Sequence, residues 1–297
     1  MKESRWIGMD VGGTKTLVAV VSDSGRVLEF VELNTPKKNS ELVAELVRLS
    51  RFFSDLFSIR GIGIAIAGNV DAANGTVENS FNLTGKKKLP IRSRVAKSSG
   101  LPVVIENDAN AWAFSEAAHS RALHLAVLTL GTGLGCGLVL NGRVFHGKGF
   151  ASQYCGAIVN PLHGRFDASG IRGTLESETN GDSVVFRAKK AGLKVKTASE
   201  VQKLAAHGNA RAKRVFKETG FWVGIGIANL ISTLHLERIV LAGGLSNSKE
   251  LILKAKKTAR EFAFPGLAKG VAIDSTRLGS FGAAIGAALL AKKTVNG

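Results

Sequence analysis

The fold is decided by residues 5–33, which read RWIGMDVGGTKTLVAVVSDSGRVLEFVEL. Three runs rich in Val, Ile and Leu are separated by Gly12-Gly13 and by Ser24-Gly25, and these small residues favour tight turns. We therefore expect three consecutive strands joined by hairpins, at 5–11, 16–22 and 26–33.

Working outward, the first half continues with a helix and two more strands. Apolar residues at helical spacing predict a helix over 39–56 that Asn39-Ser40 caps, and an apolar run predicts a buried strand over 61–67. A further strand at 103–105 runs directly into Glu106-Asn107-Asp108, and a helix is expected over 109–118. Open α/β sheets bind ligands at the carboxyl ends of their strands, so this polar segment is a candidate site.

The second half repeats the order of the first. A strand at 125–130, a glycine turn, a strand at 136–140, the turn Asn141-Gly142 and a strand at 144–146 restart the pattern. A mostly helical insertion over 150–236, strands at 238–241 and 271–274, and a helix over 281–292 complete the chain. We expect a duplicated α/β fold of two lobes. The small lobe covers 1–117 and is joined by the C-terminal helix 281–297, and the large lobe covers 118–280.

Composition restricts the class of protein. The chain is 45% apolar and 21% charged, which is typical of a soluble globular protein, and no apolar run is long enough to span a membrane. No signal peptide is visible, so we expect a cytoplasmic protein. The formal net charge of +17 favours anionic ligands such as nucleotides, but the basic residues are scattered without interleaved aromatic residues, which argues against a nucleic acid partner.

Glycine-rich turns occur at equivalent places in the two halves. Asp10-Val11-Gly12-Gly13-Thr14-Lys15 would let backbone N–H groups approach phosphate oxygens, with Asp10 holding Mg²⁺ through water. The segment LGTGLG at 130–135 repeats this arrangement, and AGGLS at 242–246 has room for a flat adenine before a helix that Ser246 or Asn247 caps. A single Gly-Gly hairpin is equally consistent with a purely structural turn, whereas two such turns favour phosphate binding. The candidate ATP-binding residues are Asp10, Gly12, Gly13, Thr14, Lys15, Gly131, Thr132, Gly133, Gly243 and Gly244.

Asp108 has two interpretations. Phosphoryl transfer to an alcohol needs one base that accepts the hydroxyl proton, and Asp108 lies where such a base is required. An Asp before a helix is, on capping preferences alone, more often the N-cap. Both interpretations remain open at this point.

Together these motifs resemble the ROK family, which comprises sugar kinases and sugar-responsive repressors. The resemblance covers almost the whole chain, and it is greatest to the glucokinase and hexokinase branch. It implies the duplicated actin/hexokinase-type fold, with two lobes and a ligand cleft between them. The segments that carry it are 10–15, GIGIAIAGNVD at 61–71 with Gly75-Thr76-Val77 and Asn82-Leu83, IENDANA at 105–111, 130–135 and 242–245.

The resemblance also implies roles for single residues. Asp108 matches the catalytic base, whereas Asn82, Asn107 and Glu176 match sugar ligands, with Glu176 in GTLE at 173–176 where the family has Gly-Cys-Leu-Glu. ATP and Mg²⁺ are the implied cofactors, and the implied partners are a sugar, a nucleotide and a second copy of the chain in a homodimer.

The chain departs from the family where its members hold a structural zinc. Members carry Glu-x-Gly-His and then Cys-x-Cys-Gly-x-x-Gly-Cys, but here the sequence reads QYCG at 153–156 and DASGIRGT at 167–174. All four ligands are replaced, so we predict no zinc site. Gln153 also replaces a sugar-binding Glu, and it keeps the ability to hydrogen-bond to hydroxyls.

Three functions are compatible with these residues. The first is an ATP-dependent kinase acting on a hexose, most often the 6-hydroxyl of glucose in this branch, with fructose, N-acetylmannosamine or N-acetylglucosamine as the alternative acceptors. The second is a repressor, which needs a DNA-reading element before the first phosphate turn, where this sequence has nine residues. The third is a protein that binds sugar or nucleotide without turnover.

Overall fold

The computed structural model describes residues 3–79, 88–148, 153–167 and 170–297, and divides them between two compact units. Unit 1 comprises Met1–Leu123, Gly137–Ser152 and Leu278–Gly297, and unit 2 comprises His124–Cys136 and Gln153–Arg277. The sequence placed 118–123 and 137–152 in the large lobe, whereas here they belong to unit 1. One reason is that a Cβ on Gly137 would lie 2.0 Å from the carbonyl oxygen of Ala109, so this segment packs directly on a helix of unit 1.

Unit 1 is built on a five-stranded sheet with the order β3-β2-β1-β4-β7. Strands β1, β2 and β3 are consecutive antiparallel neighbours, so the three predicted hairpin strands are confirmed. Strands β4 and β7 add to β1 in parallel, which places their carboxyl ends at the same edge as the end of β1. The bounds are β1 (Arg5–Val11), β2 (Lys15–Ser22), β3 (Val27–Asn34), β4 (Ile59–Ile66) and β7 (Val103–Asn107).

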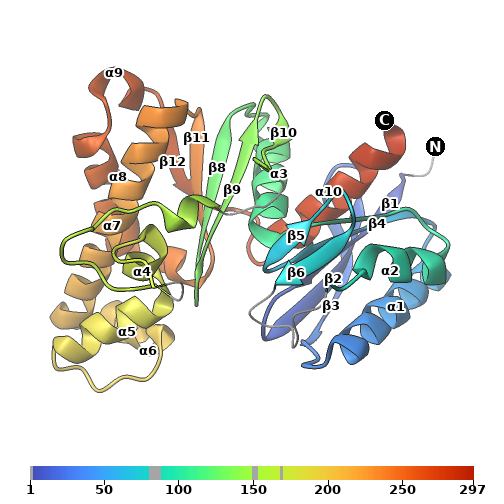
Figure 1. Cartoon of the computed structure of the whole chain (residues 1–297), viewed down its shortest axis with the longest axis horizontal. Coiled ribbons are helices and arrows are strands. Elements are labelled where there is room, and N and C mark those ends of the chain that lie inside the picture. The colour runs from blue at the N-terminus through green and yellow to red at the C-terminus, as the bar shows by residue number, and fades with distance from the viewer. Residues whose placement is uncertain (1–2, 80–87, 149–152, 168–169) are drawn as a thin grey trace. The chain divides into compact units, whose positions relative to one another are not determined.

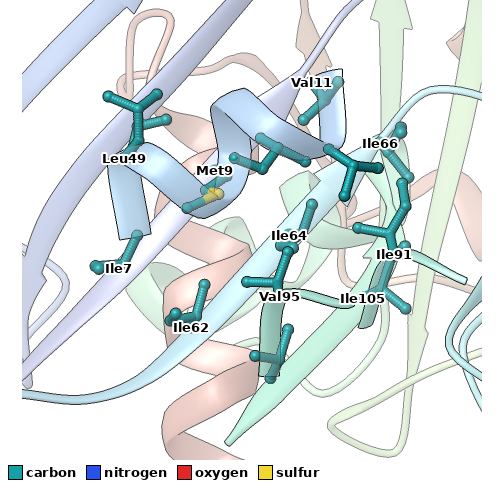
Figure 2. Packing of buried hydrophobic residues seen from close by; sticks show 14 of the residues in the cluster. Ile7, Met9, Val11, Leu49, Ile62, Ile64, Ile66, Ile91, Val95 and Ile105 are labelled. Atoms are coloured by element: carbon teal, nitrogen blue, oxygen red, sulfur yellow. The ribbon is translucent and has the colours of Figure 1, made fainter. Parts of the chain in front are cut away.

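Helices cover both faces of this sheet (Figure 1). Because side chains alternate along a strand, Ile7 and Met9 of β1 pack among residues of α1 and α2, whereas Trp6 packs with α10. Figure 2 shows the first of these clusters, in which strand and helix side chains interdigitate without a polar atom. The helices are α1 (Asn39–Leu56), α2 (Ile91–Ser99), α3 (Asp108–Ser120) and α10 (Gly282–Asn296), and a small hairpin pairs β5 (Asn69–Asp71) with β6 (Thr76–Asn79). The expected cap of α1 was wrong, because Lys38 precedes the helix and makes no side-chain cap.

Helix α10 lies with its backbone directly against the sheet. A Cβ on Gly63 of β4 would meet the carbonyl oxygen of Ala287 at 1.8 Å, and one on Gly8 of β1 would meet that of Ala284 at 1.9 Å. Within α10, Gly286 approaches α3 equally closely, 1.7 Å from the carbonyl oxygen of Ala111. Only glycine fits at these three positions, so α10 packs with backbone contact against the sheet and against α3.

Unit 2 contains parallel strands β8, β11 and β12 and most of the helices. Strand β9 then carries the chain from unit 2 into unit 1, where β10 pairs with it. The α-helices of the predicted insertion begin at residue 175, because the described residues 157–167 and 170–174 contain turns and isolated bridges but no helix. Ser248 caps α8 instead of Ser246 or Asn247, since its side chain accepts the N–H of Leu251. The bounds are β8 (Leu125–Leu130), β9 (Leu134–Leu140), β10 (Arg143–Val144), η1 (Gln153–Gly156), α4 (Leu175–Thr179), α5 (Gly181–Lys190), α6 (Ala198–Ala206), α7 (Ala210–Leu234), β11 (Arg238–Ala242), η2 (Gly244–Asn247), α8 (Lys249–Phe262), α9 (Pro265–Ala268) and β12 (Ala272–Ser275).

Among the described residues, none of the helices has the length and apolar character needed to cross a bilayer.

Replacing Gly63 with alanine tests the contact between α10 and the sheet. The new methyl group has no room beside Ala287, so we expect Gly63→Ala to lower the free energy of unfolding by about 3 kcal/mol or more, measured by urea denaturation. Gly156→Ala is the control, because a Cβ there meets nothing within 4 Å. Equal stability of the two variants would contradict the close approach.

Candidate active site

The first glycine turn joins β1 to β2 and is braced from behind. The N–H of Gly12 donates to the carbonyl of Lys15 at 3.0 Å, and the hydroxyl of Thr35 donates to the carbonyl of Gly12 at 2.8 Å. The N–H of Thr35 also donates to the carbonyl of Thr14. Among the described residues, the N–H groups of Gly13 and Thr14 have no partner within the protein, so they remain available to an anion. Thr35 was missed at the sequence level, because nothing local connects it to a turn more than twenty positions away.

Two carboxyl groups interact electrostatically in unit 1. Asp10 is the penultimate residue of β1 and Asp108 begins α3, and burial together with the charge of Asp108 raises the pKa of Asp10 from 3.8 to about 7. Burial also raises the pKa of Asp108, against hydrogen bonds from its own backbone, Ala109 and Asn107 that lower it. Two like charges held together in this way form an environment that favours a bound cation, so the pair fits the expected Mg²⁺.

The N-cap of α3 is Asn107, which settles the competing interpretation of Asp108. The amide oxygen of Asn107 accepts the N–H groups of Ala109 and Asn110 at 2.9 and 3.2 Å. Its amide nitrogen donates to the carbonyl of Gly68 at 3.1 Å, and its side chain also bonds Asp108. Asp108 is therefore the first residue of the helix and not its cap, and Asn107 orients it.

A buried glutamate supports this turn from beneath. Glu106 is 5% exposed, and one of its oxygens accepts the N–H of Asn107 at 2.9 Å and the side-chain amide of Asn110 at 3.1 Å. The other oxygen contacts Nε2 of His146 at 2.7 Å. His146 lies just after β10, forty residues after Glu106, and at the sequence level it was only the last residue of the strand expected at 144–146.

The second glycine turn joins β8 to β9 and lies beside Glu176 in unit 2. The N–H of Gly131 donates to the carbonyl of Gly133 at 3.0 Å, and the N–H of Leu134 donates to Oε1 of Glu176 at 3.3 Å. A Cβ on Gly133 would lie 2.9 Å from that same oxygen. Burial raises the pKa of Glu176, and the negative charge of Asp167 raises it further against the bond from Leu134.

The third glycine element reaches the same part of unit 2. Gly243 has a φ of +84°, and a Cβ there would lie 2.5 Å from the carbonyl oxygen of Leu130, at the start of the second turn. Its carbonyl accepts the hydroxyl of Ser246 at 2.7 Å, and the carbonyl of Gly244 accepts the side chain of Gln202 at 3.2 Å. Gly131, Thr132, Gly133, Glu176 and Gly243-Gly244 are thus brought together, as Asp10, the first turn, Asn107 and Asp108 are in unit 1. Asn82 and the side chain of Gln153 lie outside the described residues.

A model of the ROK family matches residues 6–294. The chain belongs to the ROK family. The glucokinase of Halalkalibacterium halodurans is 29% identical over 100% of this chain and 97% of the relative, and the N-acetylmannosamine kinase of Yersinia pestis is 29% identical over 85% and 88%. The crystal structure of a ROK family glucokinase from Streptomyces griseus in complex with glucose and AMPPNP has a TM-score of 0.85 at 27% identity, covering 98% of this chain and 100% of that chain. The actin/hexokinase-type fold expected from the sequence is therefore confirmed.

The residues at the positions of the ROK zinc ligands do not suit zinc. Gly156 has no side chain to offer, and the hydroxyl of Thr174 is fully buried and caps α4 by accepting the N–H of Ser177 at 3.2 Å. Ser169 lies outside the described residues, and within the described ranges no three His, Cys, Asp or Glu side chains form a group that could hold a metal. Zinc needs about four nitrogen or sulfur donors, so this donor set does not fit it.

The raised pKa of Asp10 makes stability depend on pH. The folded protein binds this proton more tightly than the unfolded chain, so the free energy of unfolding falls as the pH rises from about 4 to about 7. Without magnesium, we expect Asp10→Asn to be about 1–3 kcal/mol more stable than the wild type at about pH 8, and no more stable at about pH 4. Urea unfolding at both values measures this, with Asp55→Asn on the exposed side of α1 as the control. A gain that is the same at both pH values would be inconsistent with the shift.

The contact between His146 and Glu106 gives a pH dependence of the same sign, in the range where histidine titrates. The hydrogen bond that protonated His146 donates to Glu106, reinforced by the charge of that carboxylate, raises the pKa of His146. The resulting stabilisation is present below the ordinary pKa of histidine and is lost as the pH rises through the raised value. We expect His146→Leu to lose about 1 kcal/mol at about pH 6 and less at about pH 9, by thermal denaturation. A loss that grows with pH would contradict the assignment.

Proposed function

We propose that this chain transfers the γ-phosphoryl group of ATP to a hydroxyl of a hexose, and that the preferred reaction converts glucose to glucose 6-phosphate. One observation carries the proposal. Asp108 is a partly buried carboxylate of raised pKa, oriented by Asn107 at the carboxyl edge of a sheet, and its charge acts on a second carboxyl group, Asp10. The relatives named glucokinase and the ROK glucokinase that binds glucose and an ATP analogue support the choice of donor and acceptor.

Asp108 acts as the general base in this proposal. It accepts the proton of the sugar hydroxyl as that oxygen attacks the γ-phosphorus, while the bond to the β-phosphate oxygen breaks and ADP leaves. Burial strengthens the carboxylate as a base by raising its pKa, and the bond from Asn107 fixes the direction of its lone pairs. An amide at position 108 could orient the hydroxyl but could not take its proton.

The glycine turns and Asp10 bind the nucleotide. The free N–H groups of Gly13 and Thr14 in unit 1 and the turn at 131–133 in unit 2 would donate to phosphate oxygens. The ammonium of Lys15 pairs with Glu32 at 2.5 Å, so it would join them by sharing or leaving that partner. Asp10 would hold Mg²⁺ through water, and the ion would supply charge neutralisation on the phosphates. Gly243-Gly244 would accept the adenine, because neither residue has a side chain in its way.

Sugar hydroxyls would be bound by Asn82, Asn107, Gln153 and Glu176. The amide group of Asn107 already forms hydrogen bonds with Gly68, Asp108 and two backbone N–H groups. A sugar hydroxyl must therefore share one of these groups with the protein. An enzyme of this kind needs ATP as its phosphoryl donor, so we place it in the cytoplasm.

A kinase for another hexose is the second candidate. Gln153 and Gly156 stand where the family has a sugar-binding Glu and a sugar-binding His, and one relative is named N-acetylmannosamine kinase. Selectivity between such sugars depends on a few hydrogen bonds, so a panel of acceptors is the appropriate test.

The first test is ADP release with Mg-ATP across glucose, mannose, glucosamine, fructose, N-acetylglucosamine and N-acetylmannosamine. We expect turnover on glucose, and a fall in kcat of about 100- to 10,000-fold in Asp108→Asn, because only the proton transfer is lost. Asp182→Asn, at the start of α5, is the matched control and should retain full activity. Unchanged turnover in Asp108→Asn would remove Asp108 from the role of base, and a preference for another sugar would select the second candidate.

A further inference from the structure

We propose that the ion pair between Glu178 and Arg187 positions Glu176 for the sugar by tethering the loop between η1 and α4, described here by residues 157–167 and 170–174, in place of a bound metal ion. The inference rests on the proposed function for the role of Glu176, whereas the tether itself is a property of unit 2 alone. Glu178 and Arg187 are positioning residues, since neither is placed at the reacting atoms.

The loop closes on the residues that start α4. The N–H groups of Val159 and Asn160 both donate to the carbonyl of Gly173, at 2.8 and 3.0 Å, and the N–H of Gly173 donates to the carbonyl of Arg165 at 2.7 Å. The N–H of Leu175 donates back to the carbonyl of Ala157 at 2.8 Å. Because of these hydrogen bonds, a displacement of the loop would also move Thr174 and Leu175, and with them the neighbouring Glu176.

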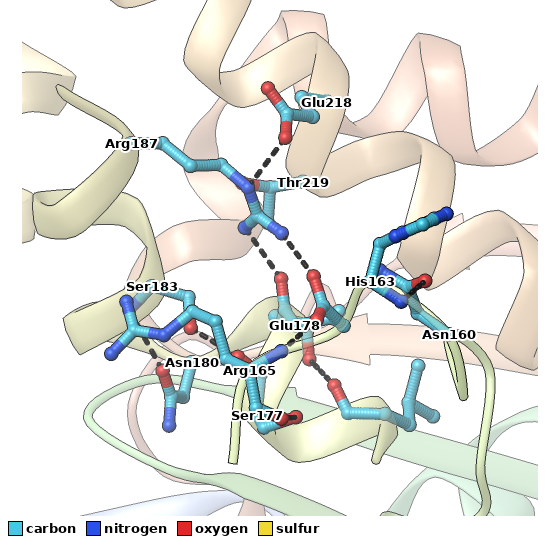
Figure 3. A network of polar contacts seen from close by, with 12 residues as sticks. Asn160, His163, Arg165, Ser177, Glu178, Asn180, Ser183, Arg187, Glu218 and Thr219 are labelled. Atoms are coloured by element: carbon cyan, nitrogen blue, oxygen red, sulfur yellow. Dashed lines mark hydrogen bonds and ion pairs between the residues drawn. The ribbon is translucent and has the colours of Figure 1, made fainter. Parts of the chain in front are cut away.

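Arg187 holds α4 through both the side chain and the backbone of one residue. Its Nη2 donates to Oε2 of Glu178 at 2.5 Å, and its Nη1 donates to the carbonyl oxygen of Glu178 at 2.7 Å. The remaining oxygen of Glu178 accepts the N–H of Arg165 at 2.8 Å, so one carboxylate joins α5 to the loop (Figure 3). Both side chains are almost fully enclosed, at 4% exposure for Glu178 and 8% for Arg187.

Water cannot replace either partner of an ion pair that is so deeply buried. Each charge has lost its hydration, so removing one partner leaves the other buried and uncompensated. The fit is also tight, because a Cβ on Gly164 would lie 2.9 Å from Oε1 of Glu178. The pair therefore specifies one arrangement of loop and helix, since a different arrangement would separate the charges.

The short helix transmits this anchoring to Glu176. Helix α4 has only five residues, Leu175–Thr179, and side chains two positions apart point to nearly opposite sides of a helix. Once Glu178 is bound to Arg187 on one side, Glu176 must project from the other. There its Oε1 accepts the N–H of Leu134 at 3.3 Å, beside the glycine turn.

Two described residues at the positions of the family's zinc ligands, Asp167 and Thr174, form hydrogen bonds within this segment. The N–H of Asp167 donates to the carbonyl of Ile171 at 2.9 Å, the Asp167 side chain accepts the N–H of Ile171 at 3.0 Å, and Thr174 caps α4. These contacts close the loop on itself but do not connect it to α5. The exposed Arg165 side chain reaches α5 by donating to the carbonyl of Asp182 at 3.3 Å and lying over the ring of Phe186. The buried connection, of the kind that a metal would provide by gathering ligands from separate segments, is made by Glu178.

The chain offers a matched control for the test. Nε of Arg187 also donates to Glu218 of α7 at 2.8 Å, but the Glu218 side chain is 55% exposed. Because water can replace that partner, Glu218→Gln removes one carboxylate from the same guanidinium without leaving a buried charge. Glu178→Gln and Arg187→Met remove the buried partners, and Arg187→Lys keeps the charge while losing the paired geometry.

The experiment measures amide hydrogen exchange of 157–176 together with kinetics and metal content. We expect Glu178→Gln and Arg187→Met to lose protection at Val159, Asn160 and Leu175 and to raise the KM for the sugar about tenfold or more, with the KM for ATP within about twofold. Arg187→Lys should fall between them and the wild type, and Glu218→Gln should match the wild type. The purified wild type should contain no stoichiometric zinc and should keep its exchange pattern after treatment with a chelator.

Three results would overturn the inference. These are unchanged protection in both buried-pair variants, an equal effect of Glu218→Gln, and bound zinc whose removal releases the loop. If Glu178→Gln or Arg187→Met does not fold, Arg187→Lys alone must raise the KM for the sugar while leaving the KM for ATP nearly unchanged. A wild type without any sugar-dependent turnover would contradict the proposed function instead, while the exchange data would still decide whether the pair tethers the loop.

Discussion

The burial of two interacting carboxyl groups, Asp10 and Asp108, is the constraint on which the site in unit 1 depends. Left to themselves, two carboxylates would separate or take up protons. Here burial raises the pKa of both, and the charge of Asp108 raises that of Asp10 further. Ala65 of β4 pairs with Asp10 on one side and with Glu106 on the other, so the register of three parallel strands fixes the distance between the charges. The backbone contact of α10 with β1 and β4 makes that register rigid. Burying these two carboxyl groups lowers the stability of the fold, and the same burial favours the binding of a cation or a proton by them.

Much of this arrangement can be read from local patterns. The hairpins of β1 to β3, the strand that ends at Glu106-Asn107-Asp108 and the two glycine turns depend on short stretches of chain, and each is where its pattern predicted. The cap of α3 was less accessible, because Asn107 and Asp108 both favour that position and only the geometry shows which one takes it. His146 and Thr35 gave no signal at all, since their partners lie far away in the sequence.

Unit 2 shows the same limit more strongly. Glu178 and Arg187 look like ordinary charged residues of a surface helix, and no periodicity marks them as buried. The sequence does show that the family's metal ligands are replaced, but it cannot show what replaces their effect. Buried ion pairs contribute little net stability compared with apolar packing, and their main effect is to specify one arrangement. Around Glu176, the ion pair is therefore more important for fixing one arrangement of the loop and α4 than for raising the free energy of unfolding.

The membership of α10 in unit 1 sets an order for the folding of a growing chain. The last stretch of unit 2 ends at Arg277, so every segment of unit 2 is made before Leu278–Gly297 and leaves the ribosome ahead of it. Until then one face of the first sheet, including Gly8 and Gly63, has no helix to cover it, although its strands were synthesised first. The N-terminal half must therefore wait, in an incompletely covered state, for the final helix, and this interval is when the chain has most need of a chaperone.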